Sequence, residues 1–126
     1  RVIASAQYNK LLVALKDVPD STLDAHPILK YRVANVRRGK NVRGVASTDS
    51  HTCWLGLDDV AVAGDYHFPC IIYMREHGNP IGKMSPRFRE NRALWVKSHD
   101  CYNDDICRKN CLDVCVDYNN EANKWH

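Results

Sequence analysis

The hydrophobic residues of the chain recur in short patterned runs, and two of these runs predict helices. In the first, apolar residues repeat at the helical period of about 3.6 residues, which predicts a helix over residues 3–16. In the second, Ser85 is suited to cap a helix and Pro86 to begin it, so we expect a helix from there to about residue 97. The apolar members of the two helices are Tyr8, Leu11, Leu12 and Leu15, then Phe88, Leu94 and Trp95.

Two other runs predict β-hairpins. Lys30–Val36 and Asn41–Ala46 favour strands, with Gly39 at the turn between them. Val60–Ala63 and Cys70–Met74 form a second pair of apolar runs around a turn that contains glycine. Together with the helices, these hairpins predict a small α+β domain with an N-terminal helix, a middle helix and a cysteine-rich helical tail.

Length and charge narrow the classes of protein to which the chain can belong. It has 126 residues and a formal net charge of +3, from 18 Lys and Arg against 15 Asp and Glu. This length suits one domain, and so small a charge does not by itself indicate a protein that coats nucleic acid. No apolar run is long enough to span a membrane, and no secretory signal opens the chain. Because the chain begins at Arg1 and not at Met, we expect a processed product or a piece of a longer protein.

Six cysteines are the most informative residues of the sequence. Four of them crowd into the fifteen residues from 101 to 115, whereas the first 52 residues contain none. Disulfide-stapled domains distribute their bridges over the fold, but thiolates that bind one metal centre must converge on a point. The spacing therefore favours metal or iron–sulfur ligation over three disulfides, and with it a reducing, cytoplasmic setting. The six are Cys53, Cys70, Cys101, Cys107, Cys111 and Cys115.

The last three cysteines are predicted to lie on one helix. Asp104 and Asp105 indicate a helix start, after which Cys107, Cys111 and Cys115 are four residues apart and share one face. Three thiolates on one face reach a single centre only if the helix axis is suitably oriented. We therefore expect one of them to point to a different partner.

The cysteine spacing resembles that of the SPASM/twitch accessory domain, which follows the barrel of radical S-adenosylmethionine enzymes. Cys53 is followed by ten residues and Gly64, and then by five residues and Cys70, as on the hairpin of that domain. The resemblance implies one or two auxiliary 4Fe–4S clusters, bound by the six cysteines, that pass electrons or place the substrate. The cysteines that match the distal group of the domain are Cys101, Cys107, Cys111 and Cys115.

The chain departs from the family pattern in two places. The interval from Gly64 to Cys70 is one residue longer, and Ser98 stands where the distal group of the family opens with a cysteine. Six cysteines cannot supply two four-ligand clusters, so we expect either one cluster with two spare thiols or a second cluster with a non-cysteine ligand or an open site. His99 is the candidate for that ligand. The family grouping, carried over, puts Cys53, Cys70 and Cys111 on one cluster and leaves Cys101, Cys107 and Cys115.

The resemblance also implies that this chain is not a radical generator by itself. Radical enzymes cleave S-adenosylmethionine at a cluster inside a barrel, and no barrel precedes these cysteines, so S-adenosylmethionine is expected only in the parent enzyme. The implied partners are that barrel domain, in cis or in trans, and the peptide or small-molecule substrate of the parent enzyme. Residues 1–50 would be the end of the barrel or a linker, and residues 51–126 the cluster domain.

Two other functions remain open from the sequence. One is a zinc-stabilised binding module that contacts nucleic acid through the basic hairpin Lys30–Arg43. The other is a secreted protein with three disulfides. No catalytic residue is predicted under any of these hypotheses.

Overall fold

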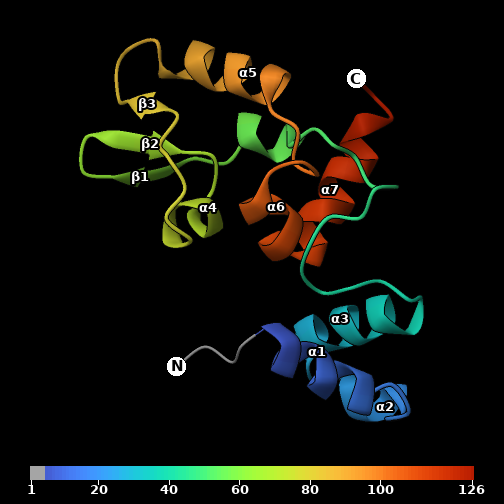
Figure 1. Ribbon diagram of the computed structural model, residues 1–126. Helices are drawn as coiled ribbons and strands as arrows, with labels where there is room; N and C mark the ends of the chain where they lie inside the picture. Colours follow the sequence, from blue (N-terminus) through green and yellow to red (C-terminus); the bar gives the residue numbers. More distant parts are fainter. Residues whose placement is uncertain (1–4) are drawn as a thin grey trace.

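Helices make up most of the computed structural model, which describes residues 5–126, and a small antiparallel sheet lies at one edge, beside α4 and α5 (Figure 1). The predicted α+β fold class is confirmed. None of the helices within this described range is long and apolar enough to cross a membrane. In chain order the elements are α1 (Ser5–Ala14), α2 (Asp20–Leu23), α3 (Pro27–Arg37), the 3-10 helix η1 (Trp54–Leu57), β1 (Ala61–Ala63), β2 (Tyr66–Phe68), α4 (Ile71–Arg75), β3 (Gly82–Lys83), α5 (Phe88–Ser98), α6 (Asp105–Asn110) and α7 (Asp113–Asn123).

Helices α1, α2 and α3 pack around an apolar core of their own at one end of the molecule (Figure 1). The helix predicted over residues 3–16 is confirmed as α1, although Leu11 is 45% exposed. Ile3, Ala4 and the side chain of Tyr8 lie outside the described residues. The buried residues of this core are Leu12, Leu23, Val33, Val36 and Val42.

The hairpin predicted over residues 30–46 is wrong, because Lys30–Val36 lies inside helix α3. Val33 and Val36 are three residues apart and both are buried, and this helical spacing outweighs the preference of valine for strands. Gly39 was expected at the hairpin tip. It instead follows the end of α3 with a φ of +80°, the left-handed conformation that commonly ends a helix.

The second predicted hairpin exists, but its returning strand comes earlier in the chain. β1 and β2 pair antiparallel, with Ala63 opposite Tyr66, around a two-residue turn in which Gly64 has a φ of +58°. β3 pairs with β2 on its other side, so the strand order is β1-β2-β3. The prediction of Cys70–Met74 as the returning strand is wrong, because Cys70 caps helix α4 and the other four residues lie inside that helix.

Helix α5 is shorter and less apolar than predicted. It begins at Phe88, after a turn that contains the predicted cap Ser85. Its buried residues are Arg92 and Val96, whereas Leu94, which was expected in the core, is 65% exposed. A charged side chain therefore occupies the inner face of this helix.

The cysteine-rich tail forms two helices instead of one. The predicted start is confirmed, since Asp104 Oδ1 accepts hydrogen bonds from two N–H groups in the first turn of α6, at 2.8 and 3.1 Å. Helix α6 ends at Asn110, the next residue Cys111 has an extended ψ of 133°, and α7 follows. The prediction that Cys107, Cys111 and Cys115 share one helix face is wrong.

The break after α6 follows from a strand-like contact with residues 42–45. The N–H of Gly44 donates to the carbonyl oxygen of Cys111 at 2.7 Å, and the N–H of Asp113 donates to that of Val42 at 2.9 Å. The carbonyl group of Cys111 and the N–H group of Asp113, which a continuous helix would use internally, are therefore bonded to residues 42–44. The same contact joins the N-terminal helices to the cysteine-rich part.

Candidate metal centre

The structure brings all six cysteines to one cavity of about 450 Å³. Residues of η1, α4, α5, α6 and α7 complete its wall, and α6 lies between α4 and α7 (Figure 1). A volume of this size is typical of sites for small ligands. The cysteines come from separate places: Cys53 before η1, Cys70 before α4, Cys101 after α5, Cys107 within α6, Cys111 at its end and Cys115 within α7.

The thiols of Cys53, Cys101 and Cys107 are successive neighbours. Contact with the Cys101 thiol, followed by burial, raises the pKa of Cys53. Contact with the Cys107 thiol raises the pKa of Cys101 in the same way. Adjacent thiolates would repel one another, so Cys53 and Cys101 favour the uncharged thiol until a cation is present.

Cys111 and Cys115 form a second close pair across the α6–α7 junction. Contact with the Cys115 thiol, together with burial, raises the pKa of Cys111. Burial is also the main reason that the pKa of Cys70 is raised, and the thiols of Cys53 and Cys115 add to this effect. Cys70 therefore lies near members of both groups. All six cysteines are free thiols.

Cys70 is held in place by the short helix that it precedes. Its backbone is extended, and its Sγ accepts a hydrogen bond from the N–H of Tyr73 at 3.3 Å. An N–H group that points at sulfur stabilises the anionic form of a ligand. The start of α4 thus orients the Cys70 thiol and supplies a hydrogen bond that would stabilise it as a thiolate ligand.

A buried arginine joins the segments that carry Cys53 and Cys70. Arg92 is 2% exposed, and it donates to the carbonyl oxygens of Gly56 at 2.9 Å and Pro69 at 3.1 Å. Its positive charge also attracts the Cys53 and Cys70 thiols in their ionised form. The guanidinium therefore fixes the backbone beside both thiols and favours a bound anion. Two further carbonyl oxygens accept from it, those of Asp59 and Phe68.

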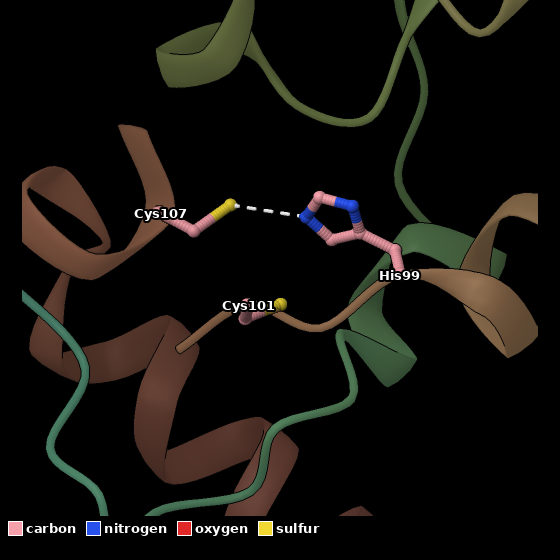
Figure 2. Close-up of side chains that lie close together, drawn as sticks. All are labelled: His99, Cys101 and Cys107. Atoms are coloured by element: carbon pink, nitrogen blue, oxygen red, sulfur yellow. Dashed lines mark hydrogen bonds between the residues drawn. The ribbon is translucent and has the colours of Figure 1, made fainter. Parts of the chain in front are cut away.

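His99, Cys101 and Cys107 form a compact group of metal-binding side chains (Figure 2). One ligand atom from each lies within 4.8 Å of the other two, and Cys107 Sγ is 3.7 Å from His99 Nε2. In the part of the chain that the structure describes, this is the one such group of three or more His, Cys, Asp or Glu residues. The two cysteines line the cavity, and His99 approaches them from the end of α5.

The orientation of His99 is fixed by its neighbours. Its ring stacks on Trp95, with centroids 4.0 Å apart and an angle of 18° between the rings. The carboxylate of Asp104 lies 3.5 Å from His99 Nε2 and accepts a hydrogen bond from the Tyr73 hydroxyl at 2.8 Å. Burial lowers the pKa of His99, which favours the neutral imidazole that binds metals.

The donor set defines which metals fit the cavity. Thiolates and an imidazole are ligands for zinc and for iron–sulfur clusters, whereas calcium and magnesium prefer oxygen. The predicted ligands are therefore brought together in a cavity lined by soft donors, and the coarse prediction of a metal-binding group is supported.

Two residues of this site were missed by the sequence analysis. Arg92 lies four residues after Phe88 and four before Val96, so a charge within the apolar stripe of α5 could have marked it. Asp104 was identified only as a helix cap, and its second contact with Tyr73 depends on the folded chain. No local sequence pattern predicts the hydrogen bond between Tyr73 and Asp104.

The basic stretch does not form the predicted nucleic-acid hairpin. Lys30, Arg37 and Lys40 each pair with an aspartate. Arg38 bonds to a neighbouring side-chain amide, and Arg43 donates to a backbone carbonyl at 3.4 Å. Most of the charge that would contact phosphate is therefore engaged within the fold.

Comparison with known proteins gave no match, since no family model, no curated protein and no solved structure matches this chain.

Proposed function

We propose that this chain binds an iron–sulfur cluster and serves as the auxiliary-cluster module of a radical S-adenosylmethionine enzyme. The observation that carries the proposal is the convergence of six cysteines, spread over 63 residue positions from 53 to 115, on one cavity. Six soft donors exceed the four that one zinc ion takes. Cysteines from separate segments surround a cavity, which suits a cluster whose irons each need a ligand.

Four of the cysteines suit a single 4Fe–4S cluster. The resemblance groups Cys53, Cys70 and Cys111, and Cys111 lies beside Cys115 in the structure. The Cys70 thiol interacts electrostatically with those of Cys53 and Cys115, and all four cysteines line the same cavity, which supports their assignment to one cluster. In this assignment Cys115 completes the ligand set of the cluster.

The surroundings of these thiols would support a negatively charged cluster. Tyr73 and Trp95 contribute aromatic surface to the cavity wall and would restrict water around the cluster. The guanidinium of Arg92 and the N–H that faces Cys70 would stabilise the charge on the thiolates and raise the reduction potential.

The proposed role is electron transfer to or from the substrate, or placement of the substrate, and not radical generation. The S-adenosylmethionine chemistry would belong to a barrel domain in cis or in trans, and the substrate would be a peptide or a small molecule. A reducing, cytoplasmic setting would keep the six thiols available for iron.

The test is anaerobic reconstitution of the chain with iron and sulfide. We expect about four irons and four sulfides per chain and a brown protein, because one 4Fe–4S cluster has that composition. Colourless, iron-free protein from a fully reduced, oxygen-free preparation would end the proposal. Reduction by dithionite, followed by electron paramagnetic resonance, separates the two roles, since a cluster that cannot be reduced cannot transfer electrons.

Matched variants locate the cluster. Cys70→Ser and Cys111→Ser should each lose most of the iron. Ser98→Ala is the control, because the Ser98 hydroxyl bonds only to carbonyl oxygens of its own helix, at 2.9 and 3.3 Å. Equal iron content in all four proteins would show that the cavity is not the binding site.

The same preparation tests the other two hypotheses. Six free thiols in the denatured, unreduced chain would exclude three disulfides. Lys30, Arg37 and Lys40 pair with aspartates, so less of the charge of the basic stretch is available for nucleic acid than the sequence suggests.

A further inference from the structure

His99, Cys101 and Cys107 are a group of three residues whose ligand atoms all lie close to one another, whereas the contacts of Cys53 with Cys101 and of Cys111 with Cys115 join thiols in pairs. All three atoms lie within 4.8 Å, and the nitrogen–sulfur distance is 3.7 Å. Zinc–sulfur bonds of about 2.3 Å and zinc–nitrogen bonds of about 2.0 Å, at tetrahedral angles, place the ligand atoms of one ion about 3.5–3.8 Å apart.

We infer that His99, Cys101 and Cys107 form a site for a single zinc ion, separate from the cluster ligands, with the fourth position open to the cavity. Two thiolates and a neutral imidazole balance the charge of a divalent cation. The resulting neutral site suits a region in which the cysteines and His99 are mostly buried. Three protein ligands with one open position are the arrangement in which zinc binds water or a substrate atom.

The supporting side chains already hold the three ligands in place. Trp95 stacks on the ring of His99, and Asp104 caps the first turn of α6, which carries Cys107. Cys101 is anchored by its backbone, since its N–H donates to the carbonyl oxygen of His51 at 2.8 Å. Ligands fixed by contacts that do not involve metal need little rearrangement to bind it.

The fourth position is assigned to an exogenous ligand and not to a further residue of the chain. Cys53 contacts Cys101 but lies outside the compact group, and Asp104 lies outside it as well. Cys101 and Cys107 both face the cavity, so a fourth ligand would enter from that side. Water, or a sulfur or oxygen atom of the substrate, matches this position chemically.

Elemental analysis and cobalt binding test the site. We expect one zinc per chain in addition to the iron. Co²⁺ added to the metal-free chain should give the visible absorption of a tetrahedral ion with thiolate ligands. His99→Ala and Cys107→Ser should weaken zinc and Co²⁺ binding by about a hundredfold or more, because even residues that only support a ligand change affinity by about 10–100-fold.

Three further variants keep the test independent of folding defects. His99→Cys should restore zinc and Co²⁺ binding, since it replaces one soft ligand with another. Cys53→Ser should keep the zinc, and His26→Ala, an exposed histidine at the start of α3, should change nothing. Loss of zinc in Cys53→Ser would overturn the open fourth position.

The outcomes separate this inference from the proposed function. No bound zinc or Co²⁺, or equal binding by His99→Ala and the unaltered chain, would overturn the zinc site and leave the cluster proposal standing. Loss of iron and sulfide in His99→Ala would also overturn it, because the residue would then be a cluster ligand. Zinc without any iron would support the inference and refute the cluster.

Discussion

Replacing Arg92 with methionine should be among the most damaging single substitutions in this chain. The guanidinium is 2% exposed, and it donates to four backbone carbonyl oxygens on both sides of the β1–β2 hairpin. Arg92→Met keeps much of the volume but leaves those acceptors without a donor. One buried unsatisfied polar group costs about 1–3 kcal/mol, and the four costs are not additive. We therefore expect a loss of about 3–5 kcal/mol in the free energy of unfolding.

Urea denaturation followed by circular dichroism measures this loss. Arg92→Lys should recover part of it, because the ammonium keeps the charge but lacks the planar fork that serves several carbonyls. Arg89→Met is the matched control on the same helix, since Arg89 is exposed and only approaches the Phe88 ring, 5.3 Å from its centroid. A loss below about 1 kcal/mol for Arg92→Met would refute the structural role.

The remaining predictions concern two glycines at which a side chain would clash with its neighbours, and the protonation of His67. Gly44→Ala should cost about 2–4 kcal/mol in a thermal or urea melt, because φ is +105° and a Cβ would lie 2.6 Å from the Arg108 carbonyl oxygen; a neutral effect would contradict the close contact. Gly78→Ala would place a Cβ 2.2 Å from the Tyr73 ring and should displace that ring, with a loss of about 1–3 kcal/mol and altered tyrosine fluorescence. Burial, then a neighbouring guanidinium, lowers the pKa of His67, so stability should be greatest above the unfolded-state pKa of about 6.5 and fall as the pH drops below it. His67→Gln should flatten that dependence between pH 7.5 and 5.5, and an unchanged slope would contradict the assignment.

An element could be predicted from the sequence where the local hydrophobic pattern and the tertiary packing favour the same structure. Helix α1 was predictable because its apolar residues follow the helical period over several turns. Helix α3 was mistaken for a strand because valines and Tyr31 favour strands locally, by less than about 1 kcal/mol per residue. Burial of Val33 and Val36 against Leu12 and Leu23 contributes more than that preference. Packing partners outside the helix, in α1 and α2, thus determined the secondary structure of this segment.

In the candidate site, too, some features could be predicted from local sequence and others depend on distant segments. Cysteine spacing alone was enough to predict that the thiols converge. Which thiol lies beside which was not predictable, because the chain bends at Cys111, and the bend is made by hydrogen bonds to Val42 and Gly44. These partners lie about seventy residues earlier, so the sequence around the tail predicts one continuous helix.

The thiols themselves form much of the core in the C-terminal half. Its buried cluster contains only Val45, Cys101 and Val116, with three more cysteines and Tyr102 packed against it. A core this small contributes little hydrophobic stabilisation, whereas the N-terminal core buries five aliphatic residues, four from the helices and Val42 from the segment after α3. When ligands come from segments that only the folded chain brings together, the free energy of metal binding becomes free energy of folding. A metal bound by the cysteines would therefore add stability in the part of the chain where apolar packing is weakest. The buried Arg92 and the half-buried Asp104 order the segments around the thiols there.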